Sequence, residues 1–165
     1  MAQPAAVVAF TSRCGATETI AHAAAVGTVN ARALPRLRRL PDDGGPAATE
    51  CADTLRRLRK EYVPPTEADI TGSQALIIVP GAGMTPSSDG WQPFMELLDR
   101  AASSGALAGK VAAVIDAGDS QTVASFSAAL AARGFALIAA AGRDARAHGR
   151  AVGAAIMSSV DSPAR

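Results

Sequence analysis

Four short runs of uninterrupted apolar residues constrain the fold of this chain more than any other feature of its sequence. Strands exposed on one face alternate apolar and polar residues, whereas strands covered by helices on both faces are apolar throughout. The runs therefore predict buried strands of a parallel sheet. They are AAVVAF (Ala5 to Phe10), ALIIVP (Ala75 to Pro80), KVAAVID (Lys110 to Asp116) and FALIAA (Phe135 to Ala140).

Segments with helical spacing separate these runs. The predicted helices span Thr17 to Val26, Trp91 to Ala102, Ser120 to Arg133 and Arg143 to Ser159. Alternating strands and helices predict an α/β fold with a parallel, doubly wound sheet. A fifth strand is needed early in the chain, and VNARAL (Val29 to Leu34) is the candidate. Five strands at this length favour the order 2-1-3-4-5, in three α/β/α layers, over a six-stranded dinucleotide-binding fold.

Length and composition indicate one globular domain spanning residues 1–165, of which 48% are hydrophobic and 19% charged. A formal net charge of +1 argues against a nucleic-acid partner. No apolar run approaches the roughly 20 residues of a membrane span. The first residues lack the basic start and long apolar stretch of a signal peptide, so we expect a cytoplasmic protein. Two distant cysteines, Cys14 and Cys51, are too few for a disulfide framework or a metal cluster.

A Pro-rich basic insertion at about 35–71 interrupts the rhythm of strands and helices. It predicts a loop, a basic helix from about Thr49 to Tyr62, and a second loop. The segment from Arg32 to Thr71 holds eight of the 16 Lys and Arg residues, interleaved with acids. Such mixed charge favours a solvated face or a subunit contact over a patch for an anionic partner. We expect the chain to form a homodimer or homotetramer, with the insertion contributing to its contacts.

The stretch TSRCGAT, from Thr11 to Thr17, joins the first apolar run to the first helix. Ligands of doubly wound sheets bind at the carboxyl ends of the strands, where the strand order reverses. Hydroxyls and unpaired N–H groups at a helix start attract anions, and Gly15 permits a tight turn. The loop lacks the glycines of a dinucleotide fingerprint and the Gly-Lys pair of a Walker loop, and Ile20 stands where a small phosphatase needs arginine. The sequence thus predicts a phosphate site.

Three further stretches are typical of one family of proteins: TSRCGATETIAHAAAVG (Thr11 to Gly27), ALIIVPG with the later FMELLDRA (Phe94 to Ala101), and SSGALAGKVAAVI (Ser103 to Ile115). In these stretches the chain resembles the flavodoxin superfamily, and most closely the WrbA-type NAD(P)H:quinone oxidoreductases. It covers most of the chain to about Ala140. The resemblance implies a flavodoxin-like fold whose first loop wraps the terminal phosphate of FMN.

Two other loops depart from the family pattern. Family members carry an aromatic residue after the third strand, against the flavin ring, but PGAGMTPSSDGW has none before Trp91. The loop after the fourth strand contains Asp116 and Asp119, whose carboxylates oppose a flavin that becomes anionic on reduction. We therefore expect FMN binding to be weak or absent. The candidate cofactor-binding residues are Ser12, Arg13, Cys14, Gly15, Ala16, Thr17, Gly81, Ala82, Gly83, Asp116, Ala117 and Gly118.

Four single residues allow two interpretations each. Cys14, beside Arg13 at a helix start, has the setting of a reactive thiolate, although a small side chain lining a ligand loop is commoner. His22 and His148 lie in helices without nearby ligands, which favours surface or interior positions. Trp91 either stacks on the flavin ring or packs in the core.

The resemblance implies an FMN-binding oxidoreductase that transfers electrons from NAD(P)H, as co-substrate, to a quinone or another acceptor. It names no acid–base residue, so the catalytic residues stay unknown. The altered ring loops favour an alternative, a flavodoxin-like module that binds little or no flavin and acts through protein partners.

Overall fold

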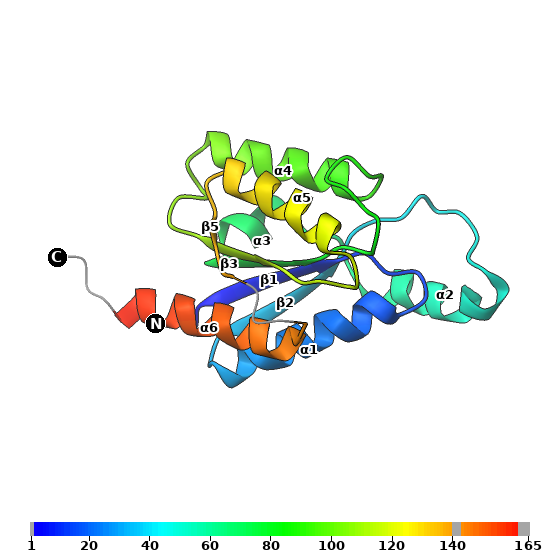
Figure 1. Ribbon diagram of the computed structural model, residues 1–165, viewed down its shortest axis with the longest axis horizontal. Coiled ribbons are helices and arrows are strands. Elements are labelled where there is room, and N and C mark those ends of the chain that lie inside the picture. Colours follow the sequence, from blue (N-terminus) through cyan, green and yellow to red (C-terminus); the bar gives the residue numbers. More distant parts are fainter. Residues whose placement is uncertain (1, 140–142, 162–165) are drawn as a thin grey trace.

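The computed structural model describes residues 2–139 and 143–161. Five parallel strands form one sheet in the order β2-β1-β3-β4-β5, with helices on both faces (Figure 1). This confirms the predicted three-layer flavodoxin-like fold. The elements are β1 (Ala5–Phe10), α1 (Ala16–Asn30), β2 (Leu34–Arg39), the 3₁₀ turn η1 (Thr49–Cys51), α2 (Ala52–Glu61), α3 (Glu67–Thr71), β3 (Ala75–Val79), α4 (Trp91–Ser103), β4 (Val111–Val114), α5 (Ser120–Ala132), β5 (Ala136–Leu137) and α6 (Ala145–Asp161).

Alternate residues of each strand serve the two core layers, because successive side chains of a strand point to opposite faces. On β1, Val7 and Ala9 join the layer beneath α3, α4 and α5. Val8 and Phe10 join the layer that α1 and α6 cover. Both faces of the sheet are thus buried at β1, β3 and β4, which is why these three strands are apolar without alternation.

The apolar runs locate four of the strands. The bounds of β1 match the first run, and β3 and β4 lie within the second and third. Strand β5 is two residues long, shorter than predicted, and Ala140 lies outside the described residues. Each predicted long helix is present, although α1 continues four residues beyond Val26.

The fifth strand was predicted at Val29 to Leu34, and this is wrong. Helix α1 continues to Asn30, the chain turns through Arg32 with a φ of 66°, and β2 begins only at Leu34. Half of the β2 sequence, LPRLRR, is arginine, and β2 tolerates this charge because it is an edge strand that, among the described residues, pairs with β1 alone. An edge position also tolerates Pro35, which has no N–H to donate.

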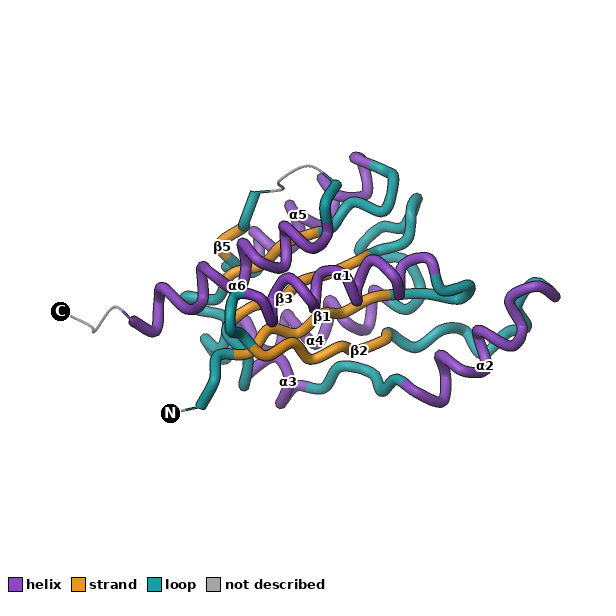
Figure 2. The backbone as a smooth tube through the Cα atoms, turned by 90° about the horizontal axis from the view of Figure 1, so that it is seen from below, coloured by secondary structure: helices purple, strands orange, loops and turns teal. Residues whose placement is uncertain are grey.

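The basic insertion contains β2, a loop, η1, α2 and α3. Figure 2 shows α2 standing beyond the sheet, beside the start of α1. Several of its charges are paired: Arg38 binds Asp69 through two contacts of 2.9 Å, and other arginines bind Glu18 and Asp42. This pairing agrees with the interleaved, solvated face that the sequence favoured. A role in subunit contacts stays a prediction.

Helices α1 and α6 pack with their backbones nearly touching, because glycines stand at the crossing. A Cβ atom on Gly149 would collide with the carbonyl oxygen of Ala24, and one on Gly27 would collide with that of Arg146. A Cβ on Gly153 would lie 2.7 Å from the Cβ of Ala31. Only glycine permits this approach, so small residues at these positions fix the distance between the two helices.

We expect Gly149→Ala to lower the free energy of unfolding by about 1–3 kcal/mol, because the added methyl group forces the helices apart. Helix propensity alone predicts the opposite, since alanine is favoured over glycine within a helix by about 1 kcal/mol. Urea denaturation gives the change, and Ala154→Gly at an exposed position of α6 calibrates the propensity effect. A Gly149→Ala variant as stable as the wild type would contradict the packing argument.

Candidate functional site

The loop after β1 lies where ligands of doubly wound sheets bind. Strand β1 sits between β2 and β3, so the strand order reverses beside its carboxyl end. Gly15 is the N-cap of α1, and its φ of 93° is one that other residues rarely adopt. The described residues supply no hydrogen-bond partner for the N–H groups of Ala16, Thr17 and Glu18. These three N–H groups, at the positive end of α1, can donate hydrogen bonds to a bound anion.

The hydroxyl groups of Ser12 and Thr17 shape this loop. Ser12 Oγ accepts a hydrogen bond from the N–H of Gly15 at 3.0 Å. The Thr17 hydroxyl donates to the carbonyl oxygen of Thr11. Both side chains are buried. A hydroxyl that accepts one bond still has a hydrogen to donate, so Ser12 can hold the turn and bind a ligand together.

Arg13, predicted as a phosphate ligand, points its guanidinium at the loop after β2. It donates to Asp43 at 2.9 Å and to the carbonyl oxygens of Gly45 and Pro46 at 3.2 and 2.8 Å. Its charge is therefore engaged with that loop. The positive charge at the start of α1 comes mainly from the helix itself.

Arg39 is a residue of the site that the sequence did not single out. Its guanidinium is buried and donates twice to the carbonyl oxygen of Ser12, at 3.0 and 2.9 Å. It also binds Asp42 at 2.5 Å, and Asp42 in turn binds Arg59 of α2 at 2.6 Å. The arginine-rich insertion was the available signal, but only the fold shows which arginine supports the first loop.

The two cysteines form a single disulfide, which the sequence did not predict. Cys14 and Cys51 form a disulfide that links the first loop to the start of α2. Thirty-seven positions separate them in the sequence, and the insertion folds back to bring them together. Cys14 is exposed and Cys51 is buried. In this structure neither residue is the free thiolate considered for Cys14.

The loops after β3 and β4 are joined directly. The N–H of Gly83 donates to Asp119 Oδ2 and to Thr122 Oγ1, both at 3.1 Å. We call this contact the loop clasp. The Thr11 hydroxyl lies 3.3 Å from the sulfur of Met84, which links the first loop to the loop after β3. The three sequence-predicted groups of site residues therefore lie along one edge of the sheet.

Asp116 and Asp119 build the loop after β4. Asp119 caps α5, accepting hydrogen bonds from the N–H groups of Gln121 and Thr122. The Thr122 hydroxyl, followed by these N–H donors, holds the pKa of Asp119 below its ordinary value. Asp116 accepts from the N–H groups of Gly118 and Asp119, at 2.6 and 2.8 Å. Both carboxylates have this structural role, whatever they face.

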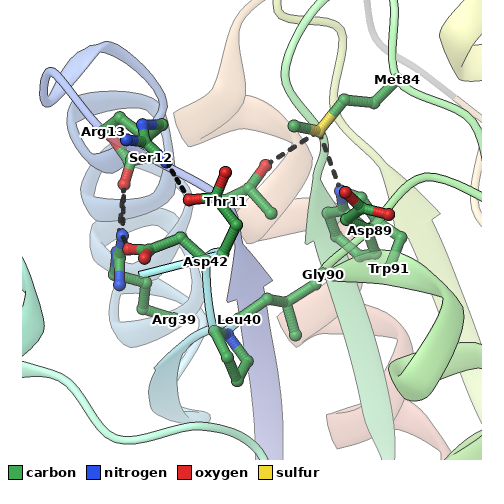
Figure 3. A pocket seen from close by; sticks show the side chains of 12 residues that line it. Thr11, Ser12, Arg13, Arg39, Leu40, Asp42, Met84, Asp89, Gly90 and Trp91 are labelled. Carbon is green, nitrogen blue, oxygen red and sulfur yellow. Dashed lines mark hydrogen bonds and ion pairs between the residues drawn. The ribbon is translucent and has the colours of Figure 1, made fainter. Parts of the chain in front are cut away.

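A pocket of about 170 Å³ opens between the first loop, the loop after β2 and the start of α4. Figure 3 shows Met84 above it, with its sulfur accepting hydrogen bonds from Thr11 and from the indole N–H of Trp91. The Trp91 side chain is fully buried and meets Phe126 edge to face, with ring centroids 4.8 Å apart. Of its two possible roles, the structure shows packing in the core.

A polar network beside the first loop ties α1 to α2. Arg57 donates two hydrogen bonds to Glu18, at 2.9 and 2.7 Å, and lowers the pKa of that carboxyl. The Tyr62 hydroxyl donates to Glu18 and lies 2.7 Å from His22 Nε2. His22 is exposed and His148 is buried. The sequence favoured either a surface or an interior position for each histidine, and both positions occur.

Other chemistries find no support within residues 2–139 and 143–161. No group of three or more His, Cys, Asp or Glu residues there could hold a metal ion. No helix in the same ranges has the length and hydropathy to cross a membrane.

Comparison with known proteins places the fold. No protein-family model matches the sequence, and no curated protein matches it. The solved structure of a flavodoxin, WrbA-like protein from Agrobacterium tumefaciens superposes with a TM-score of 0.63 at 17% identity, over 97% of this chain and 100% of that one. A flavodoxin from the domain Archaea gives 0.60 at 11%, over 90% and 96%. Two-electron reduced flavodoxin from Megasphaera elsdenii gives 0.59 at 12%, over 90% and 98%. The chain therefore has the flavodoxin-like fold.

The contacts of Asp42 generate a pH prediction. Hydrogen bonds, from Arg59 first and then from Arg39 and the N–H of Gly44, hold the pKa of Asp42 well below its ordinary value of 3.8. A carboxylate with a depressed pKa stabilises the fold fully above that ordinary value, and this stabilisation is lost as the pH falls toward the folded-state pKa. We expect Asp42→Asn to lower the free energy of unfolding at pH 7 by about 1–3 kcal/mol.

Urea denaturation at pH 7 and at pH 3 tests this, and the difference between wild type and Asp42→Asn should shrink at pH 3. Asp53→Asn is the control, because the Asp53 side chain is 93% exposed and, among the described residues, binds Arg56 alone. Removing the charge of Asp53 should change the free energy of unfolding by less than about 0.5 kcal/mol. An equal effect of Asp42→Asn at both pH values would show that its charge is irrelevant.

Proposed function

We propose that the chain binds FMN through its terminal phosphate, in the loop from Ser12 to Thr17. The observation that carries this is the start of α1, where three N–H groups are unpaired among the described residues and Gly15 holds a left-handed turn. Arg39 and the hydroxyls of Ser12 and Thr17 hold that loop in place, so little reorganisation is needed when a phosphate arrives. The phosphate end of the site thus fits the cofactor.

The proposed activity is electron transfer from NAD(P)H to a quinone or another acceptor, as the resemblance to WrbA-type oxidoreductases implies. When bound, FMN supplies the hydride-transfer chemistry. The chain contributes an anion site at the start of α1 and two loops, after β3 and β4, that bound the space for the ring. We also propose assembly into a homodimer or homotetramer, with the basic insertion contributing to the contacts between subunits.

The ring end of the site favours a second candidate, a flavodoxin-like module that binds little or no flavin and acts through protein partners. The loop clasp joins Gly83 to Asp119 and Thr122, in the space between the two loops that would receive the ring. Ring binding therefore requires the clasp to open.

Titration of the protein with FMN, followed by quenching of flavin fluorescence, distinguishes the two candidates. We expect weak binding by wild type and at least tenfold weaker binding by Ser12→Ala combined with Thr17→Ala, which corresponds to about 1.4 kcal/mol. Thr71→Ala with Ser158→Ala is a matched control, because in the described part of the chain each hydroxyl donates to a carbonyl oxygen of its own helix and to nothing else. Equal binding by both double variants would place the phosphate elsewhere.

The activity has its own readout. FMN-dependent oxidation of NADH or NADPH in the presence of a quinone would support the oxidoreductase. No detectable binding at millimolar FMN would reject it and leave the flavin-poor module.

The loop clasp generates a separate prediction. Asp119→Asn keeps an oxygen to cap α5 but removes the charge that opposes a reduced flavin and weakens the bond to Gly83. We expect this variant to bind FMN about fivefold more tightly, or about 1 kcal/mol. Asp99→Asn, at a half-exposed position on α4, is the charge-matched control. Unchanged or weaker binding by Asp119→Asn would show that the clasp does not limit access.

A further inference from the structure

The Cys14–Cys51 disulfide joins two unlike environments. Cys14 lies in the exposed part of the first loop, directly before the N-cap of α1. Cys51 is 9% exposed and is itself the N-cap of α2. One sulfur atom therefore belongs to an accessible residue, and the other to a residue set into the protein.

We infer that this disulfide is a thiol–disulfide exchange site whose substrates are dithiols, either small molecules or dithiol proteins. The reaction needs no flavin, so it is independent of the proposed FMN function. It would give the chain a second redox activity at the same edge of the sheet.

The exposure of the two residues decides which of the two sulfur atoms an incoming thiolate attacks. A thiolate of the dithiol attacks Cys14 Sγ, a bond forms between those two sulfurs, and the bond to Cys51 breaks. Cys51 leaves as a thiolate and takes up a proton. The second thiolate of the dithiol then attacks the first sulfur of the same dithiol, which is bonded to Cys14 in the mixed disulfide. The bond to Cys14 Sγ breaks, and Cys14 is released as a thiolate that takes up a proton. Two electrons and two protons pass to the protein, and the dithiol becomes a disulfide.

Both products of this reaction are stabilised by their positions. The positive end of α1, a helix of 15 residues, lies beside Cys14, and that of α2, a helix of 10 residues, lies at Cys51. A helix N-terminus stabilises a thiolate, which makes Cys51 a good leaving group. Stabilisation of the reduced form is also what makes a disulfide readily reducible.

The fold has enough other contacts to survive the opening of the disulfide. Helix α2 buries Leu55 and Leu58, which are 2% and 0% exposed. Arg57 and Arg59 bind Glu18 and Asp42, at 2.7 and 2.6 Å. Reduction therefore releases the covalent link while α2 stays docked, as a reversible site requires.

Reduction of the native protein by dithiothreitol tests the inference. Thiols are trapped with a maleimide at successive times and counted by mass, with the same reaction in urea as reference. We expect two thiols to appear at a rate within about 100-fold of the rate in urea, because the target sulfur belongs to an exposed residue. Circular dichroism should show an unchanged fold. A native rate more than about 100-fold slower, or loss of the fold on reduction, would make the disulfide structural and overturn the inference.

The direction of attack is tested separately with glutathione disulfide and reduced single variants. Cys51→Ser should form a mixed disulfide at Cys14 at least tenfold faster than Cys14→Ser forms one at Cys51. Peptide mapping of wild-type protein treated with a labelled monothiol gives the same information without a variant, and the label should lie on Cys14. Equal rates, or a label on Cys51, would reject the proposed reaction.

Discussion

The buried guanidinium of Arg39 is the contact on which the carboxyl edge of the sheet depends. It joins the last residue of β2 to the carbonyl oxygen of Ser12 and to Asp42, which Arg59 of α2 also binds. A buried charged group is tolerated only when its N–H groups have hydrogen-bond acceptors. The carbonyl oxygen of Ser12 and the carboxylate of Asp42 are such acceptors for Arg39. One side chain thus sets the first loop, the loop after β2 and α2 relative to one another.

The candidate site has two ends of different character. At the start of α1, backbone N–H groups remain unpaired among the described residues, and Ser12, Thr17 and Arg39 hold the shape of the loop. At the other end, backbone donors and carboxylates of the loops after β3 and β4 satisfy one another. An anion would meet unpaired donors at the first end, whereas a ring bound between the loops after β3 and β4 would have to displace existing hydrogen bonds.

The sequence predicted the parts of the fold that local patterns determine. Apolar runs located β1, β3 and β4 because a strand that is buried on both faces has an unbroken apolar sequence, which is easy to recognise. Strand β2 was misplaced because an edge strand tolerates charge and proline, as LPRLRR shows. The glycine turn at Gly15 was visible locally. The contacts of Arg39 with Ser12, of Cys14 with Cys51 and of Asp119 with Gly83 were not, because each joins residues distant in the sequence and depends on how the insertion and loops fold back.

The glycine crossing of α1 and α6 has a consequence for synthesis. These helices stand at opposite ends of the order of elements, yet each covers the same face of the sheet. On the ribosome, α1 emerges long before residues 145–161, and its small-residue face has nothing to pack against during that interval. This layer of the core closes only after translation of α6. Until then the nascent chain exposes apolar surface, the condition in which chaperones bind growing polypeptides.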